Sequence, residues 1–253
     1  MNNTLIKGLR IVELLAHAER PLSLTEIALR LGMEKSNVHR LLQPLAEMRY
    51  IARNQETGRY TASIRLWELG SAVLERLDLK CQAADGMQEL MEATGESVHL
   101  SVMEQGDVVY VHKVDSLNPV RAYSQIGGRA PASCVATGKA ILAYQAESVL
   151  RRLAADLRPL TPNTIIDPER FMREMAQIRR QGFAVNRGEW RAAVHGVAAP
   201  IGDSMGRVVA AVGVSGPAER FKPAQVRKFS ARVMSVAARI SAQLFGEAPA
   251  RLW

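Results

Sequence analysis

The chain is poor in cysteine and has no long hydrophobic run. Only Cys81 and Cys134 occur among its 253 residues. Two cysteines are too few for a disulfide framework or a thiolate metal site, so we expect a reducing compartment. The amino-terminal segment MNNTLIKGLRIVELL lacks the uninterrupted apolar stretch of a signal peptide, and no window approaches a membrane span. These absences predict a cytoplasmic protein with no membrane partner.

Metal and nucleotide motifs are also missing. The five histidines are scattered, and neither H-x-x-x-H nor C-x-x-C spacing occurs, so we expect no metal. Gly138-Lys139 resembles the end of a phosphate-binding loop. That motif fails because Ser133 replaces its first glycine and Ala140 replaces its final Ser or Thr. We therefore predict no cofactor.

Acidic residues are outnumbered. The 33 Lys and Arg against 25 Asp and Glu give a formal charge of +8 and a pI near 9.9, which favours a polyanionic partner. Residues 1–62 hold nine basic and six acidic side chains, a net charge of +3. Much of the remaining excess lies in an Arg-rich stretch at residues 151–180, which we interpret as solvent-facing helices.

Residues 22–61 have the layout of a winged helix-turn-helix. Ser23 and Glu26 form an S-x-x-E capping box, and the apolar positions that follow at steps of three and four end at Gly32. The next helix has a predicted buried stripe of Val38, Leu41, Leu42, Leu45 and Met48. Pro44 lies inside this helix, where its ring predicts a kink that leaves the reach of Gln43 open.

The opposite face of that helix carries groove-reading side chains. Arg can bind guanine through two hydrogen bonds, Asn or Gln can bind adenine, and Ser and Lys can hold phosphates. The candidate DNA contacts on this helix are Lys35, Ser36, Asn37, His39, Arg40 and Gln43. Two predicted strands at 50–53 and 59–61 supply Arg53 and Arg59 for a wing on the DNA backbone. A solvated helical domain is the alternative, but the basic hairpin favours double-stranded DNA.

The rest of the chain predicts a linker helix and a second, α+β domain. A helix at residues 4–18, with a seam of Leu5, Leu9, Val12 and Leu15, completes the first core. A linker helix follows, and its apolar residues Ile64, Trp67, Val73 and Leu74 are available to a second subunit. The predicted boundaries are 1–62 for the DNA-binding domain, 63–78 for the linker and 79–253 for the second domain.

Alternating and helical patterns divide the second domain. Strands are predicted at 97–103, 108–114, 120–125, 183–186, 194–201 and 207–215. Helices are predicted at 79–93, 137–144, 147–156 and 168–181, with a closing helix from Pro223 to Gly246. The residues that this last helix should bury are Val226, Phe229, Val233, Val236, Ile240 and Leu244. Antiparallel strands with helices packed beside them are typical of a sensing domain.

The whole chain resembles the IclR family of bacterial transcriptional regulators. The resemblance lies in residues 5–60, which begin LIKGLRIVELL, and in the segments TGESVHLSV, GRAPASCVATGKAILA and HGVAAPIGDSMGRVVAAVGVSGP. It implies a winged-helix DNA-binding domain, a GAF-like effector-binding domain, and dimers or tetramers on pseudo-palindromic operators. It also implies control of a nearby catabolic operon, more often by repression than by activation.

The resemblance also implies an effector pocket near residues 131–139. Small residues there, and a helix amino terminus, would suit a carboxylate. Asn186, Gly196 and Gly213 depart from the family's acidic, Cys and Ser positions, which implies a larger or less polar cavity for a bulkier organic acid, aromatic acids included. The full candidate set is Tyr123, Ala132, Ser133, Cys134, Asn186, Trp190, Val194, Gly196, Gly213 and Ser215.

Two other functions compete with a ligand-responsive regulator. A thiol enzyme would use Cys134 with His99, His112 or His195, but no base or nucleophile motif surrounds these residues. An architectural DNA binder would need wedging apolar side chains or a dense basic surface, whereas the second helix presents mixed polar groups. We therefore expect a regulator and no enzyme activity.

Overall fold

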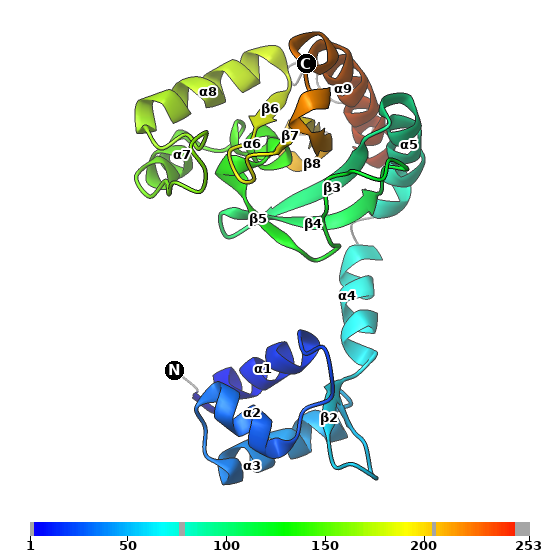
Figure 1. Cartoon of the computed structure of the whole chain (residues 1–253), viewed down its shortest axis with the longest axis vertical. Helices are drawn as coiled ribbons and strands as arrows, with labels where there is room; N and C mark the ends of the chain where they lie inside the picture. The colour runs from blue at the N-terminus through cyan, green and yellow to red at the C-terminus, as the bar shows by residue number, and fades with distance from the viewer. Residues whose placement is uncertain (1–2, 76–78, 204–205, 246–253) are drawn as a thin grey trace. The chain divides into compact units, whose positions relative to one another are not determined.

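The computed structural model describes residues 3–75, 79–203 and 206–245 and divides into two compact units, residues 1–76 and 77–253 (Figure 1). Helix α4 thus groups with the first unit. The expected roles of Val73 and Leu74, and the expected helix end at Gly246, fall outside the described residues and side chains. None of the helices in the described ranges has both the length and the apolar character needed to cross a membrane.

The amino-terminal unit is a winged helix-turn-helix followed by a fourth helix. Its elements are α1 (Asn3–Ala16), α2 (Leu24–Leu31), α3 (Lys35–Glu47), β1 (Ile51–Arg53), β2 (Tyr60–Ala62) and α4 (Arg65–Glu75). The capping box begins α2, since the Ser23 hydroxyl accepts the Glu26 amide at 3.3 Å and the Glu26 carboxylate accepts the Ser23 amide at 2.8 Å. Gly32 ends α2 at φ 61°, as a left-handed cap requires.

The core of this unit differs from the predicted one at three positions. Leu5 and Leu9 are 62% and 54% exposed, while Ile11 and Leu15 form the buried stripe of α1. Two stripes fit the helical period of α1, and the period alone does not choose between them. Met48 is 61% exposed because it follows the last residue of α3. The expectation that Leu5, Leu9 and Met48 are buried was wrong.

The carboxy-terminal unit is built on one antiparallel sheet of order β5-β4-β3-β8-β7-β6. Its strands are β3 (Ser97–Glu104), β4 (Asp107–Val114), β5 (Arg129–Pro131), β6 (Ala184–Arg187), β7 (Val194–Gly202) and β8 (Val208–Pro217). Its helices are α5 (Leu79–Thr94), α6 (Ala136–Leu142), α7 (Glu147–Ala154), α8 (Pro168–Gln181) and α9 (Pro223–Phe245), with short 3-10 turns at Ala132–Cys134 and Ala218–Arg220.

Helices cover both faces of this sheet. The long α9 packs beside α5 against one face, and α6 packs against the other face with α7 and α8 outside it (Figure 1). Phe229, Val233, Val236 and Ile240 of α9 are buried, as predicted, whereas Val226 and Leu244 are half-buried. The sequence-based prediction of an α+β domain with an antiparallel sheet is confirmed.

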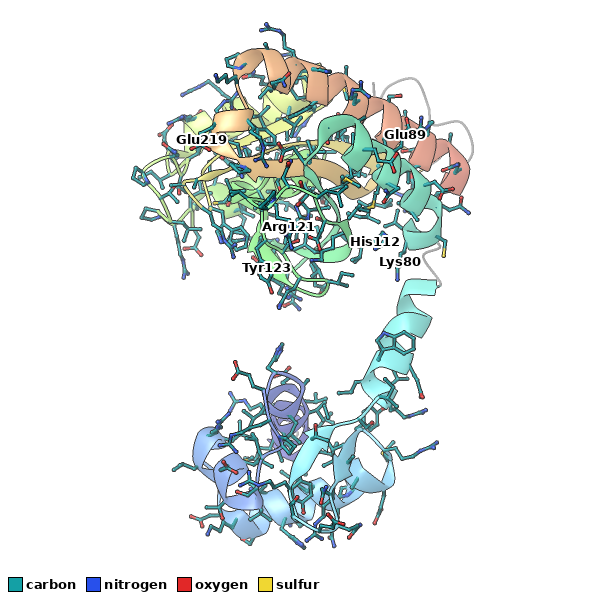
Figure 2. All side chains as sticks on the ribbon, turned by 45° about the vertical axis from the view of Figure 1, so that its right-hand side comes forward. Lys80, Glu89, His112, Arg121, Tyr123 and Glu219 are labelled. Atoms are coloured by element: carbon teal, nitrogen blue, oxygen red, sulfur yellow. The ribbon has the colours of Figure 1, made fainter. Side chains whose placement is uncertain are left out.

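One predicted strand does not exist. Residues 120–125 are irregular, and the edge strand is β5 instead. The alternation that suggested a strand is real, since Arg121 and Tyr123 are exposed while Ala122 and Ser124 are buried. Figure 2 shows Arg121 and Tyr123 at the surface of this unit. We call residues 115–128 the capping segment.

Side chains from outside the capping segment take the place of a strand partner. Four side chains donate to its backbone carbonyl oxygens: Arg220 to Val120 at 3.0 Å, Ser97 to Ala122 at 3.5 Å, Arg191 to Tyr123 at 3.4 Å and Lys113 to Ser124 at 3.1 Å. Because these carbonyls are satisfied without a neighbouring strand, the extended segment leaves the sheet and crosses over it.

Candidate DNA interface and effector pocket

The outer face of α3 presents the predicted reading residues. Lys35, Ser36, His39, Arg40 and Gln43 are exposed and Asn37 is half-buried. The opposite face is anchored by Val38, Leu41 and Leu42 in the core of the unit. Helix α3 continues through Pro44 to Glu47, and the Met48 amide donates to the Pro44 carbonyl at 2.9 Å. All reading residues therefore precede the proline.

The hairpin β1–β2 forms the predicted wing. Its turn is held by Asn54, whose side-chain oxygen accepts the amides of Glu56 at 3.0 Å and Thr57 at 2.8 Å. Gly58 follows at φ 66°, a conformation that glycine adopts without strain. The exposed Arg53 lies with its guanidinium carbon 5.7 Å from the centre of the Tyr60 ring. Arg53 is thus held on the outer surface of the wing.

Arg59 has partners inside the unit. Its guanidinium donates to the Glu26 carboxylate at 2.9 Å and to the Pro21 carbonyl oxygen at 3.0 Å. Hydrogen bonds from Ser23, the backbone amide first, lower the pKa of Glu26 to about 2, and Arg20 adds to the effect. The expected phosphate contact from Arg59 competes with these bonds, so its structural role is to brace the wing.

A pocket opens in the carboxy-terminal unit between the sheet, the first turn of α6 and the capping segment. Its cavity volume is about 40 Å³. The pocket is therefore narrow. Its lining residues are His99, Tyr110, Ala122, Tyr123, Ser124, Val135, Ala136, Thr137, Asn186, Trp190, Arg191, Val194, Gly196, Gly213, Val214 and Ser215.

Seven of the ten candidate effector residues meet at this pocket. They are Tyr123, Asn186, Trp190, Val194, Gly196, Gly213 and Ser215. Ala132, Ser133 and Cys134 do not line it, because they form the 3-10 turn that precedes α6. The first turn of α6 takes their place through Val135, Ala136 and Thr137. Ser133 and Cys134 line a separate surface hollow beside α7.

The glycines of the pocket allow close backbone packing and do not enlarge the cavity. A Cβ on Gly213 would lie 2.6 Å from both the Ala198 Cβ and the Val197 carbonyl oxygen. A Cβ on Gly196 would lie 2.9 Å from the Val214 carbonyl oxygen. The expectation that these two glycines leave a larger cavity was wrong, because neighbouring atoms already fill the space.

His99 organises the polar side of the pocket. Its Nε2 lies 2.6 Å from the Ser215 hydroxyl and its Nδ1 lies 3.1 Å from the Ser124 hydroxyl. Burial lowers the pKa of His99 to about 4, so the ring is neutral near pH 7. The Tyr110 ring lies 5.3 Å away, and burial raises its pKa to about 12. The pocket thus offers neutral donors and acceptors.

Among the described residues that line the pocket, Arg191 is the one with a charged side chain. Its guanidinium carbon lies 4.4 Å from the centre of the Trp190 ring, and Nη1 donates to the Tyr123 carbonyl oxygen at 3.4 Å. This exposed cation sits at the rim, and none of the lining residues that the structure describes is acidic. The arrangement favours a ligand with a negative charge.

Sequence reasoning missed Tyr110, Thr137 and Arg191 and considered His99 only as a base for Cys134. A signal for His99 was present, because Ser97, His99 and Ser101 alternate along a strand that is otherwise apolar. Such a polar stripe on a buried face indicates a site or a network. Ser101 extends this stripe to α6 through a 3.0 Å hydrogen bond with Thr137.

Asn186 shapes a loop more than it offers a ligand contact. Its side-chain oxygen accepts the amides of Gly188 at 2.9 Å and Glu189 at 3.0 Å. Its side-chain nitrogen donates to the Val194 carbonyl oxygen at 3.3 Å. These bonds set the turn that carries Trp190 to the pocket.

Cys134 has the environment of a core residue. It is buried, its Sγ lies 3.4 Å from the Ser133 hydroxyl, and burial raises the pKa of the thiol. A catalytic cysteine needs the opposite shift. His99 is bound by two serines, and among the described residues no three His, Cys, Asp or Glu side chains gather as a metal site would require. The geometry gives the thiol enzyme no support.

Comparisons with known proteins agree across most of the chain. Residues 4–55 match the family model described as the IclR helix-turn-helix domain, and residues 71–242 match that of the bacterial transcriptional regulator IclR C-terminal domain. The HTH-type transcriptional regulator KdgR of Escherichia coli is 32% identical over 89% of this chain and 87% of that protein. The Escherichia coli transcriptional repressor IclR is 28% identical over 94% of this chain and 88% of that protein.

A solved structure shows the same architecture. The crystal structure of the Thermotoga maritima IclR superposes with a TM-score of 0.81 at 33% identity, covering 97% of this chain and all of that one. The relatives are transcriptional regulators and not enzymes. The chain belongs to the IclR family of DNA-binding transcriptional regulators.

Proposed function

We propose that this regulator represses a catabolic operon and responds to a small organic acid that binds beside His99 and Arg191. The observation that carries the proposal is the single cation in the pocket lining, with neutral hydrogen-bonding groups around it. A carboxylate on Arg191 gains a charge-assisted hydrogen bond, whereas a ligand cation would be repelled. Repression is favoured by the similarity to IclR of Escherichia coli, a transcriptional repressor.

The walls of the pocket favour an aromatic ligand. The space is narrow, and its walls include the rings of Tyr110, Tyr123 and Trp190. Aromatic walls suit an aromatic acid through stacking. The Ser215 hydroxyl is already bound to His99 and can present only its remaining hydrogen-bonding capacity to a ligand.

DNA binding is proposed to follow the winged-helix pattern. The reading set is Lys35, Ser36, Asn37, His39, Arg40 and Gln43 on α3, with Arg53 on the wing. Two copies would place α3 in successive major grooves of a pseudo-palindromic operator. The exposed Ile64, just before α4, and Trp67 of α4, at 71% and 68%, are suited to contact a second subunit. Effector binding would shift operator affinity by changing how the two subunits are oriented.

The effector proposal is tested on the intact protein with benzoate and with benzamide, its neutral analogue. A ligand that binds the native state raises the melting temperature. We expect benzoate to raise it and to weaken a gel-shift complex with DNA from the neighbouring promoter, while benzamide does neither. Arg191→Ala should abolish the response to benzoate. An equal response to benzamide would contradict a charge-selective pocket.

A further inference from the structure

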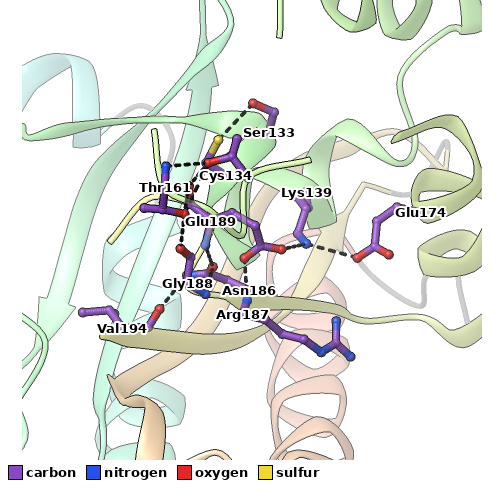
Figure 3. A network of polar contacts seen from close by, with 11 residues as sticks. Ser133, Cys134, Lys139, Thr161, Glu174, Asn186, Arg187, Gly188, Glu189 and Val194 are labelled. Atoms are coloured by element: carbon purple, nitrogen blue, oxygen red, sulfur yellow. Dashed lines mark hydrogen bonds and ion pairs between the residues drawn. The ribbon is translucent and has the colours of Figure 1, made fainter. Parts of the chain in front are cut away.

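Lys139 is a fully buried cation in α6. Its side chain has no solvent exposure, and its Nζ donates to Glu189 Oε1 at 2.7 Å and to Glu174 Oε1 at 3.1 Å (Figure 3). Glu189 is itself 5% exposed, whereas Glu174 is 20% exposed. A buried ammonium is costly without such partners. The Gly138-Lys139 pair resembles the end of a phosphate-binding loop, but the Lys139 ammonium binds the carboxylates of Glu174 and Glu189.

Glu189 connects Lys139 to the loop after β6. The second carboxylate oxygen of Glu189 accepts the Arg187 amide. The backbone carbonyl oxygens of Gly188 and Glu189 each accept a threonine hydroxyl at 2.7 Å, from Thr161 and Thr164 respectively (Figure 3). Thus the side chain of Glu189 holds the turn internally and ties it to α6.

The residues directly after this loop line the pocket. Trp190 and Arg191 follow Glu189 in sequence, and both lie in the lining, whereas Lys139 does not. The start of α6, two to three residues before Lys139, contributes Ala136 and Thr137 to the same lining. The ion pair between Lys139 and Glu189 therefore joins two walls of the pocket.

We propose that Lys139 is a positioning residue for the effector site, because its bond to Glu189 fixes Trp190 and Arg191 at the pocket. The proposal rests on the proposed function only in calling the pocket an effector site. The alternative is that Lys139 only fills the core. The two differ in what they predict for Trp190 once the ion pair is replaced by neutral side chains of similar size.

The test follows Trp190 fluorescence in full-length protein. Trp67→Phe and Trp253→Phe leave Trp190 as the one tryptophan. Acrylamide quenching then reports its shielding without any effector, so the test stands even if no organic acid binds. We expect Lys139→Met to raise the quenching constant about twofold or more at temperatures where circular dichroism shows a folded protein. Glu174→Gln, which keeps the 2.7 Å bond, should leave it unchanged.

A double variant separates positioning from core filling. Lys139→Met with Glu189→Gln removes the uncompensated buried carboxylate, so the melting temperature should return toward that of the parent. The quenching constant should stay raised, because the link between α6 and the loop is still missing. Should Lys139→Met not fold, the double variant alone decides. A parental quenching constant in the folded double variant would overturn the proposal.

Discussion

Arg59 Nη1 lies 2.9 Å from Oε2 of Glu26, and this ion pair joins the wing to the first turn of α2. Glu26 completes the capping box with Ser23 and also binds Arg20 at 2.7 Å. One carboxylate therefore caps a helix and holds the hairpin beside it. The wing of this regulator is braced from inside its own domain.

Removing the brace should weaken binding to every DNA sequence alike. Arg59→Ala and Glu26→Gln each free the wing, so we expect a similar loss of affinity for operator and random DNA in fluorescence anisotropy titrations. The double variant should lose little more than either single variant, because the two residues act through one contact. Additive losses would show that Arg59 and Glu26 act separately.

Arg40 should contribute sequence preference. It lies exposed on the outer face of α3, before Pro44. Arg40→Ala should reduce operator affinity by about 1–3 kcal/mol and relax the preference at one base pair. Gel-shift titrations against single-base operator variants measure both effects. Arg10→Ala removes the same charge from the exposed surface of α1 and serves as the control; an equal effect of both changes would mean that only net charge matters.

Acid should destabilise the carboxy-terminal unit through His99. Its pKa in the folded protein is lowered from 6.5 to about 4, so the neutral ring stabilises the fold above pH 6.5. This contribution, up to about 3 kcal/mol, is lost as the pH falls from 6.5 toward 4. Urea denaturation at several pH values should show the loss, and His99→Gln should flatten it. The lowered pKa values of His112 and His195 act in the same direction.

Gly138 should not tolerate a side chain. A Cβ there would collide with the Ala132 carbonyl oxygen and lie 2.7 Å from its carbonyl carbon. Gly138→Ala should cost about 1–3 kcal/mol or more in the free energy of unfolding. Gly8→Ala is the control, since no heavy atom of the residues that the structure describes lies within 4 Å of its Cβ position. That change should stabilise α1 by up to about 1 kcal/mol, and equal losses in both variants would contradict the argument.

The sequence was sufficient to predict the amino-terminal unit because its signals are local. The capping box at Ser23, the stop at Gly32 and the turn at Asn54 depend on residues only a few positions apart. The same reasoning failed for Leu5 and Leu9, because the choice between two stripes of α1 depends on distant partners.

The effector pocket was harder to predict because it is assembled from distant segments. The absence of a side chain at Gly213 suggested a larger cavity, yet residues of the neighbouring strand fill that space. Arg191 carries no local signal, since its role arises only when the capping segment crosses the sheet. Lys139 was visible in a motif, but its partner Glu189 lies fifty residues away. The spacing of residues along the chain does not predict contacts between segments so far apart.

Four of the hydrogen bonds that hold the capping segment reach its main-chain carbonyl oxygens and not its side chains. Arg220 and Lys113 would bind the same carbonyl oxygens whatever amino acids stood at Ala122 and Ser124. Ala122 can therefore be replaced while the capping segment keeps its path, whereas a replacement of Ser124 also removes the hydroxyl that is bound to His99. A substitution at Ala122 can therefore change which ligand the pocket prefers without disturbing the sheet beneath it.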